Sequence, residues 1–101
     1  MRSDDDLIEQ IKRLGQQQAQ LAALQSKLPG MNESGTAGGG KVAVKINGRG
    51  ELLSLSIDPS LLDPAHKDEL EAMILGATRL ARSRIDTMIE FEMQRMAGAQ
   101  A

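Results

Sequence analysis

The sequence predicts a small α+β protein, in which an N-terminal helix, an antiparallel sheet of two to three strands and a long C-terminal helix form one domain over residues 1–101. Apolar residues recur at seven-residue spacing before Pro29-Gly30, alternate with polar residues on both sides of Asn47–Gly50, and recur at helical spacing after Asp63-Pro64. The core must be modest and aliphatic, because the chain is short and Phe91 is its only aromatic residue.

The first element is a helix over residues 1–28, which Ser3 or Asp4 can cap and which Pro29-Gly30 ends. Gly15 in its interior costs about 1 kcal/mol relative to Ala, so the helix depends on packing. Its apolar residues form one narrow stripe: Leu7, Ile11, Leu14, Leu21, Leu24 and Leu28. The stripe packs either on the second helix of the same chain or on a second subunit, and its short length does not decide between them.

Residues 29–40 are Gly-rich and predict a flexible connector with a possible short strand, followed by a β-hairpin over residues 41–58. Each strand of the hairpin alternates apolar with more polar residues, and the apolar sets are Val42, Val44 and Ile46, and Leu53, Leu55 and Ile57. A four-residue turn at Asn47–Gly50 pairs Val44 with Leu53 and Val42 with Leu55, which places both sets on one face. Such an apolar face needs a covering helix.

The last element is a helix over residues 63–97, opened by Asp63 as the N-cap and by Pro64 in the first turn. At 1.5 Å per residue it is about 50 Å long, whereas a compact domain of this size is roughly 35 Å across. Its far end must therefore project, and the apolar residues there need cover from a second copy. The predicted homodimer interface consists of Arg84, Ile85, Met88, Ile89 and Phe91.

The composition excludes several classes of site. The chain has no Cys and a single His, His66, so a disulfide, a thiolate site and a histidine pair for a metal are all ruled out. We predict no metal and no cofactor, and a solvated surface position for His66. No apolar run approaches the roughly 20 residues of a membrane span, and the N-terminal segment lacks the hydrophobic region of a signal peptide. These features predict a cytoplasmic protein without membrane contact.

One run matches part of a phosphate-binding loop. Gly35–Lys41 fits the first seven positions of the GxxxxGK pattern, but Val42 takes the place of the Ser or Thr that holds magnesium. A predicted strand follows the run, whereas a phosphate loop opens a helix whose N-terminal amides hold the anion. We predict a connector here, no small-molecule substrate and no enzyme activity.

Three segments in this order and spacing resemble the YbaB/EbfC family of bacterial nucleoid-associated proteins: Gly38–Gly48 (GGGKVAVKING), Leu55–Leu62 (LSIDPSLL) and Leu70-Glu71. The resemblance covers nearly the whole chain. It implies a homodimer with a central antiparallel sheet and projecting helices like tweezer arms, which binds DNA and influences nucleoid organisation or gene expression. It implies no catalysis.

The sequence departs from the family's pattern in two places. Met31–Ser34 shows little apolar alternation, so the strand that relatives have before the Gly-rich stretch is expected to be short here. Arg79-Leu80 replaces an Asn-Asp pair that is common in the second helix of the family. A DNA contact made by that pair in relatives is therefore not carried over to this chain.

The expected DNA contact is to the phosphate backbone of a duplex, with weak sequence preference, because the chain has neither aromatic residues placed to stack on bases nor a recognition helix. The candidate contacts are Lys12, Arg13, Lys41, Lys45, Arg79 and Arg82. An exposed ion pair with Asp86 is the alternative role of Arg82. The net charge of -2 opposes nucleic-acid binding. It permits the alternative function, a dimeric protein-interaction scaffold or regulator that does not bind DNA.

Overall fold

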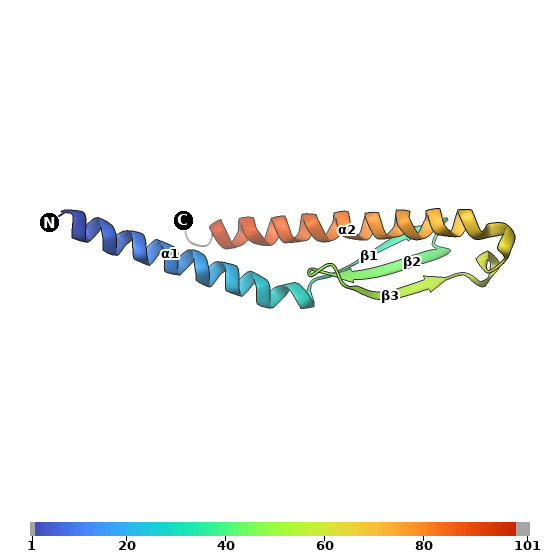
Figure 1. The fold of residues 1–101 in the computed structure, drawn as a ribbon, viewed down its shortest axis with the longest axis horizontal. Coiled ribbons are helices and arrows are strands. Elements are labelled where there is room, and N and C mark those ends of the chain that lie inside the picture. The colour runs from blue at the N-terminus through green and yellow to red at the C-terminus, as the bar shows by residue number, and fades with distance from the viewer. Residues whose placement is uncertain (1, 99–101) are drawn as a thin grey trace.

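The computed structural model describes residues 2–98, with side chains from Asp4 onward. It shows a three-stranded antiparallel sheet with one long helix lying along it and a second long helix extending from one end (Figure 1). The elements are α1 (Arg2–Lys27), β1 (Asn32–Ala37), β2 (Val42–Asn47), β3 (Leu52–Ile57) and α2 (Lys67–Gly98). Short 3-10 turns occupy Leu28–Gly30, Pro59–Leu61 and Pro64–His66. The sheet order is β1-β2-β3, and the predicted α+β fold class is confirmed.

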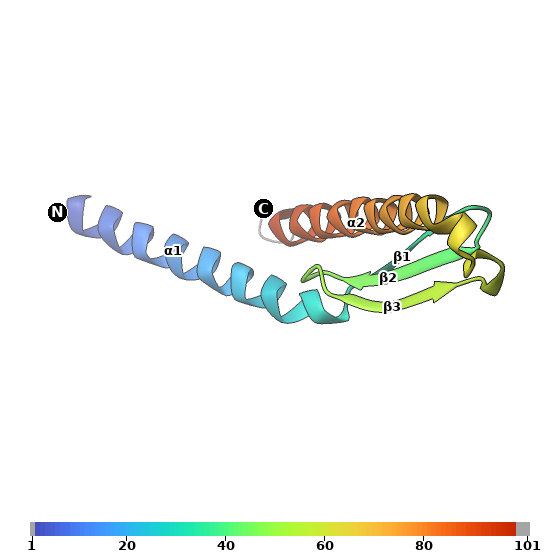
Figure 2. The same cartoon turned by 45° about the vertical axis from the view of Figure 1, so that its right-hand side comes forward.

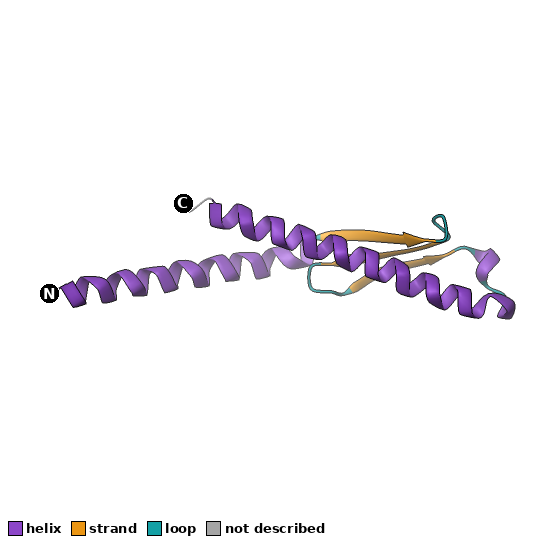
Figure 3. Cartoon of the chain, turned by 90° about the horizontal axis from the view of Figure 1, so that it is seen from above, coloured by secondary structure: helices purple, strands orange, loops and turns teal. Residues whose placement is uncertain are grey.

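The molecule is a rod of 76 × 19 × 18 Å with a radius of gyration of 20.7 Å. A compact chain of 100 residues has a radius of gyration of only about 13 Å. Helix α2 lies along the sheet and continues past it, while α1 leaves the same end of the sheet and reaches beyond the end of α2 (Figures 1 and 2). Seen from above, α2 crosses the sheet diagonally (Figure 3). The second helix thus projects as its length predicts.

Most of the apolar side chains of helix α1 are not packed against other parts of the chain. It begins at Arg2, so Ser3 and Asp4 lie inside the helix and neither is its N-cap, and Met1 lies outside the described residues. Leu7 and Leu14 of the apolar stripe are 55% and 58% exposed, and Leu24 is the only described side chain of α1 that is buried. Packing on α2 therefore involves only the last turns of the stripe, and the remainder is uncovered.

Strand β1 replaces most of the flexible connector predicted over residues 29–40, and at six residues it is as long as β2 and β3. The expectation of a short strand is therefore wrong. The sequence of β1, NESGTA, lacks apolar alternation, and the strand forms because its backbone pairs with β2 and packs against α2. Pro29–Met31 before β1 and the turn between β1 and β2 remain of the connector, and Gly38, Gly39 and Gly40 in the turn have positive φ, which favours glycine.

Gly35 allows β1 to approach α2 closely. It is buried, and a Cβ atom at this position would lie 2.6 Å from the amide nitrogen of Ala81 and closer still to the carbonyl oxygen of Ala77. Ala77 and Ala81 are themselves fully buried. Because the opposing atoms belong to the helix backbone, they cannot turn aside as a flexible side chain could. Small residues on both sides of this contact set the distance between helix and sheet.

The β2–β3 hairpin has a different register from the one predicted. Val44 lies opposite Leu55 and Val42 opposite Ile57, so both meet a partner two positions further along than expected. A shift of two residues keeps Leu55 and Ile57 on their predicted face, because side chains alternate with a period of two, whereas Ile46 lies opposite Leu52 and Leu53 is left out of the pairing. The hairpin therefore has the apolar face that the pattern predicts, built from different pairs.

The turn explains the shifted register. The side-chain oxygen of Asn47 accepts hydrogen bonds from the backbone amides of Arg49 and Glu51, both at 3.0 Å. Asn47 and Glu51 also bond through their backbones, with the Asn47 amide 3.1 Å from the Glu51 carbonyl oxygen. A bulge then leaves Leu53 without a partner on β2. The extra residue in β3 is the physical reason why a simple four-residue loop predicts the wrong pairs.

The core lies between α2 and the β1–β2 half of the sheet. Its buried members are Val42, Val44, Ile46, Leu61, Ala77, Ala81 and Ile85. Helix α2 packs on β1 and β2, whereas β3 is the strand farthest from it (Figure 2). The helix-facing side of β3 is therefore uncovered, and Leu52 and Leu55 are 55% and 46% exposed.

The predicted capping role of Asp63 is confirmed, although the element that it opens is different. Its carboxylate accepts a hydrogen bond from the Ala65 amide at 2.9 Å and starts a single 3-10 turn, and the α-helix begins at Lys67. Asp58 does the same for the preceding turn, where its carboxylate is 2.9 Å from the Ser60 amide. The hydrogen bonds from Ser60, helped by the charge of Lys41, lower the pKa of Asp58.

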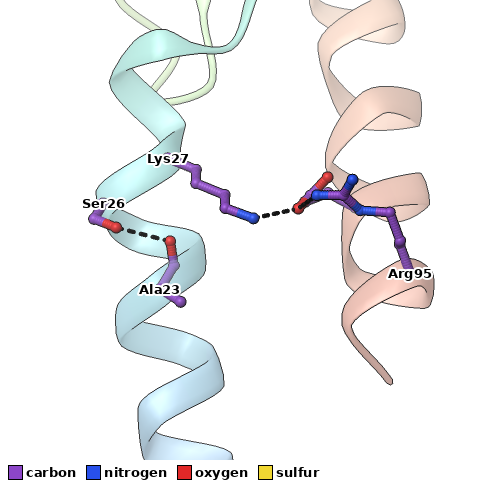
Figure 4. A network of polar contacts seen from close by, with 5 residues as sticks. Ala23, Ser26, Lys27 and Arg95 are labelled. Atoms are coloured by element: carbon purple, nitrogen blue, oxygen red, sulfur yellow. Dashed lines mark hydrogen bonds and ion pairs between the residues drawn. The ribbon is translucent and has the colours of Figure 1, made fainter. Parts of the chain in front are cut away.

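Polar contacts join the ends of the two helices (Figure 4). The Lys27 ammonium lies 2.7 Å from a carboxylate oxygen of Glu92, and the Arg95 guanidinium lies 2.6 Å from the same oxygen. The hydrogen bonds from Lys27 and Arg95 lower the pKa of Glu92 below its ordinary value. Gln20 also donates to the carbonyl oxygen of Met96 at 3.5 Å. These contacts hold the last turns of α1 against the projecting end of α2.

We expect the contact between α1 and α2 to loosen at acidic pH. A lowered pKa means that the carboxylate of Glu92 stabilises the contact above its ordinary pKa of 4.5, and that this stabilisation is lost as the pH falls through the lowered value. Spin labels on cysteines introduced at Gln18 and Gln94 report the distance between the helices, since the chain has no other cysteine. The distance distribution should broaden on acidification while circular dichroism shows intact helices.

The variant Glu92→Gln should show the broad distribution already at neutral pH, with no further change on acidification. A narrow, pH-independent distribution in this variant would mean that apolar packing alone positions α1.

Candidate nucleic-acid interface

The predicted DNA contacts on the two helices are exposed. Lys12 and Arg13 lie on α1, and Arg79 and Arg82 lie on α2. The residues of α2 that face the sheet are Ala77, Ala81 and Ile85. Arg79 is on the opposite side of the helix, and Arg82 is on its flank, beside the hairpin turn. None of the four cations forms a salt bridge with another described residue. The alternative role of Arg82, an ion pair with Asp86, is thus not formed, and all four side chains can contact an external anion.

The tip of the hairpin adds a cation that the sequence reasoning missed. Arg49 is exposed in the turn, and together with Arg82 and Asp86 it lines a shallow hollow between the turn and α2. A Cβ atom on Gly50 would lie 3.6 Å from a guanidinium nitrogen of Arg82, which places that arginine against the turn. The sequence places Arg49 at the tip of a hairpin, and this position could have identified it as a candidate DNA contact. The proximity of Arg49 to Arg82 depends on how α2 crosses the sheet.

Lys45 lies on the other side of the molecule, on the face of the sheet that α2 leaves open. Its neighbours across the strands are Ser34 on β1 and Ser54 on β3. The adjacent pairs place Thr36 and Ser56 on the same face, and all of these side chains are exposed. Hydroxyl groups and lysines are common phosphate ligands in protein–DNA complexes. The sequence reasoning named Lys45 but missed the hydroxyls, because two of them belong to β1, a strand that was expected to be short and whose register was not predicted.

Lys41 is exposed in the turn before β2, where its charge acts on Asp58. The six predicted cations therefore do not form one patch. Lys45 is on the open face of the sheet, Arg79 and Arg82 are on the opposite side of the molecule, and Lys12 and Arg13 are on the projecting helix α1. A ligand that touches several of these groups must be long, and DNA meets that requirement.

The residues predicted for a dimer interface have different environments. Ile85 belongs to the core of its own chain and is 2% exposed, so it offers no surface to a second copy. Ile89 is half-buried against the same core. The Arg84 guanidinium donates to the carbonyl oxygen of Ser34 at 2.8 Å. Met88 is half-buried and Phe91 is 68% exposed.

The Gly-rich run has no geometry for holding a nucleotide. Its first residues, Gly35–Ala37, are in β1, and Lys41 leads directly into β2. No helix N-terminus follows, and the amides of such a terminus are what bind phosphate in a phosphate loop. His66 lies at the surface, 3.3 Å from Glu69. Among residues 4–98, no group of three His, Asp or Glu side chains gathers as a candidate metal site. None of the described helices is both long and apolar enough to cross a membrane.

Comparison with known proteins places this arrangement in a family. A model of the YbaB/EbfC DNA-binding family matches residues 3–100. A nucleoid-associated protein of Granulibacter bethesdensis is 42% identical over 88 residues, which are 87% of this chain and 82% of that protein. A nucleoid-associated protein of Gluconacetobacter diazotrophicus is 40% identical with the same coverage.

An uncharacterised protein of Helicobacter pylori has a similar crystal structure, with a TM-score of 0.65 and 27% identity. The match covers 76% of this chain and 89% of that one. The agreement in sequence and fold over nearly the whole length confirms the resemblance, and the chain belongs to the YbaB/EbfC DNA-binding family.

Proposed function

We propose that this chain is a homodimer that binds duplex DNA in the bacterial nucleoid, within the cytoplasm. It contacts mainly phosphates, has weak sequence preference, performs no catalysis and influences nucleoid organisation or gene expression. The observation that carries the proposal is the match to a DNA-binding family over residues 3–100. The names of the relatives support the location, because they are nucleoid-associated proteins.

The distribution of charge supports contact with the phosphate backbone. Arg49, Arg79 and Arg82 are exposed cations along one side of the molecule, and Lys45 lies among hydroxyls on the other. The net charge of -2 opposes binding, but a dimer carries every cation twice. Phe91 is the only aromatic side chain, so bases have no series of rings on which to stack. Phosphate contacts position a protein without reading sequence, so we expect little preference among duplexes.

A salt series tests the proposal directly. Fluorescence anisotropy with two labelled duplexes of unrelated sequence should show that log affinity falls linearly with log salt between 50 and 300 mM, with a similar slope for both, because each phosphate contact adds about -0.9 to the slope. A shallow slope with unequal affinities would indicate base readout. If the folded protein binds neither duplex even at low salt, the proposed function is wrong.

One observation favours the second candidate, a protein-interaction scaffold. The ends of α1 and α2 enclose an apolar groove lined by Leu21, Leu24, Met93, Met96 and neighbouring residues. Methionine-rich grooves adapt to varied apolar partners. A protein that binds no DNA but binds a helical peptide in this groove would have the scaffold function.

A further inference from the structure

We infer that Arg49 at the hairpin tip and Arg82 on α2 together bind one phosphate of the duplex backbone, and that Asp86 beside them opposes this binding. The inference rests on the duplex binding proposed above. It adds Arg49 as a contact and assigns two arginines from different elements to a single phosphate.

The two arginines line the same hollow between the hairpin turn and α2. The hollow has a volume of about 220 Å³, and Gly50 and Asp86 also line it. Pockets that enclose a whole small molecule usually have about 300 Å³ or more, so this hollow suits one group of a larger ligand. Gly50 has positive φ, and a Cβ atom there would lie 3.6 Å from a guanidinium nitrogen of Arg82. The glycine therefore lets the turn and the Arg82 guanidinium lie side by side.

The backbone of the turn positions Arg49 but offers no amide to an anion. All four amides of residues 48–51 donate hydrogen bonds within the chain. Three of these bonds go to Asn47, which is only 4% exposed, and the fourth goes from Gly48 to the carbonyl oxygen of Leu28 at 2.9 Å. The turn is thus fixed both to the sheet and to the end of α1. An anion in the hollow must be bound by the arginine side chains.

The charge of the hollow explains why both arginines are needed. Arg49, Arg82 and Asp86 are exposed, and none of them forms a salt bridge with another described residue. Two positive charges and one negative charge leave one positive charge, which balances the single charge of a phosphate diester. Without either arginine the hollow is neutral and attracts a phosphate only weakly. Arginine also matches phosphate geometry, since its planar fork donates two parallel hydrogen bonds.

The place of the hollow in the fold identifies a backbone phosphate as the occupant. The hairpin turn lies at the end of the sheet from which α1 leaves (Figures 1 and 2). Arg79 lies over the sheet, because its neighbours Ala77 and Ala81 pack there. The turn is therefore between α1 and Arg79 along the rod, and a duplex that contacts both passes it. A free phosphate would gain only the two exposed arginines, whereas a duplex gains the other contacts as well.

A double-mutant cycle on the salt dependence of duplex binding tests whether one phosphate is shared. Each phosphate contact contributes about 0.9 to the slope of log affinity against log salt, so its loss from both subunits of a dimer flattens the slope by about 1.8. We expect Arg49→Ala, Arg82→Ala and the combined variant all to flatten the slope by this same amount. A combined loss of about 3.6 means that the arginines bind separate phosphates, and a wild-type slope for Arg49→Ala means that the turn does not contact DNA. Either result overturns the inference while duplex binding stands.

Neutralising Asp86 tests the charge balance. Asp86→Asn added to Arg49→Ala should restore the wild-type slope, because Arg82 then carries an unopposed positive charge. The matched control is Glu90→Gln, which removes the same charge from an exposed position one turn further along α2, outside the hollow. This control should leave the slope of Arg49→Ala flat. Rescue by both substitutions, or by neither, contradicts the charge balance on which the inference rests.

Inorganic phosphate distinguishes a free anion from the duplex backbone as the source of the phosphate. Calorimetry with millimolar phosphate should show no binding, and saturable binding that Arg49→Ala abolishes would overturn the duplex contact in favour of a free-phosphate site. Circular dichroism verifies that each variant is folded, as expected for exposed side chains. A wild type that binds no duplex at low salt overturns the proposed function, and this inference with it.

Discussion

Replacing Arg79 and Arg82 together by alanine is expected to flatten the salt dependence of duplex binding by about 3.6 in the slope of log affinity against log salt. The figure follows from two phosphate contacts in each subunit of a dimer, each of which contributes about 0.9. At 0.1 M salt the same loss corresponds to an affinity reduction on the order of 10³-fold. Both side chains are exposed and form no salt bridge with described residues, so the fold should be unchanged.

The control for this variant is Lys67→Ala, which removes an exposed cation from the first turn of the same helix. Lys67 is paired with Glu71 at 3.9 Å, and we assign it no contact with DNA. Its removal should leave the slope unchanged. If the double variant binds two unrelated duplexes with wild-type affinity and slope, α2 does not contact DNA and the interface lies elsewhere, with Lys45 and its neighbouring hydroxyls as the next candidates. Unequal losses on the two duplexes would show that the arginines read bases.

Gly35→Ala is expected to cause a large loss of stability, about 3 kcal/mol. The added methyl group would lie 2.6 Å from the Ala81 amide nitrogen and closer to the Ala77 carbonyl oxygen. These atoms are part of the helix backbone, so the whole of α2 must move away from β1 and loosen the core around Ala77 and Ala81. Urea unfolding followed by circular dichroism, at one fixed protein concentration, measures the change.

Gly76→Ala is the matched control on α2. A Cβ atom at Gly76 has no neighbour within 4 Å, and alanine is the better helix former, so this variant should gain about 1 kcal/mol. The two glycines thus predict opposite signs for the same substitution. A Gly35→Ala protein as stable as the wild type would show that the helix and the sheet can separate at little cost, and that the small residues do not set their distance.

The sequence pattern correctly predicted the elements whose formation depends on residues close together in the chain. The seven-residue spacing of leucines identified α1, the alternation around Val44 identified the hairpin, and the Asp63 cap placed the start of the second helix within a few residues of Lys67. Each of these signals acts between residues close in sequence, where backbone geometry alone sets which side chains share a face. The resemblance to the YbaB/EbfC family was also present in the residues, since its motifs keep their spacing along the chain.

The same reasoning misplaced features that depend on residues distant in sequence. Strand β1 has no strand-like pattern and exists because Gly35 lets it pack on α2, more than 40 residues away. Ile85 faces the core instead of a second subunit, because the direction in which α2 crosses the sheet decides which of its apolar residues are covered. The bulge at Leu53 changed the hairpin pairs, kept Leu55 on its predicted face and brought Leu52 in place of Leu53 opposite Ile46.

For the candidate site, the sequence by itself determined which side chains carry positive charge and that aromatic stacking is not available. Only the tertiary structure decided which of those charges are neighbours, because neighbours such as Arg49 and Arg82 come from different elements. The same holds for the hydroxyls around Lys45, which three strands bring together. It holds also for β3, whose leucines are indistinguishable in sequence from core residues. They are exposed because a single helix is too narrow to cover three strands, and that limit is a property of packing between layers, which no local pattern encodes.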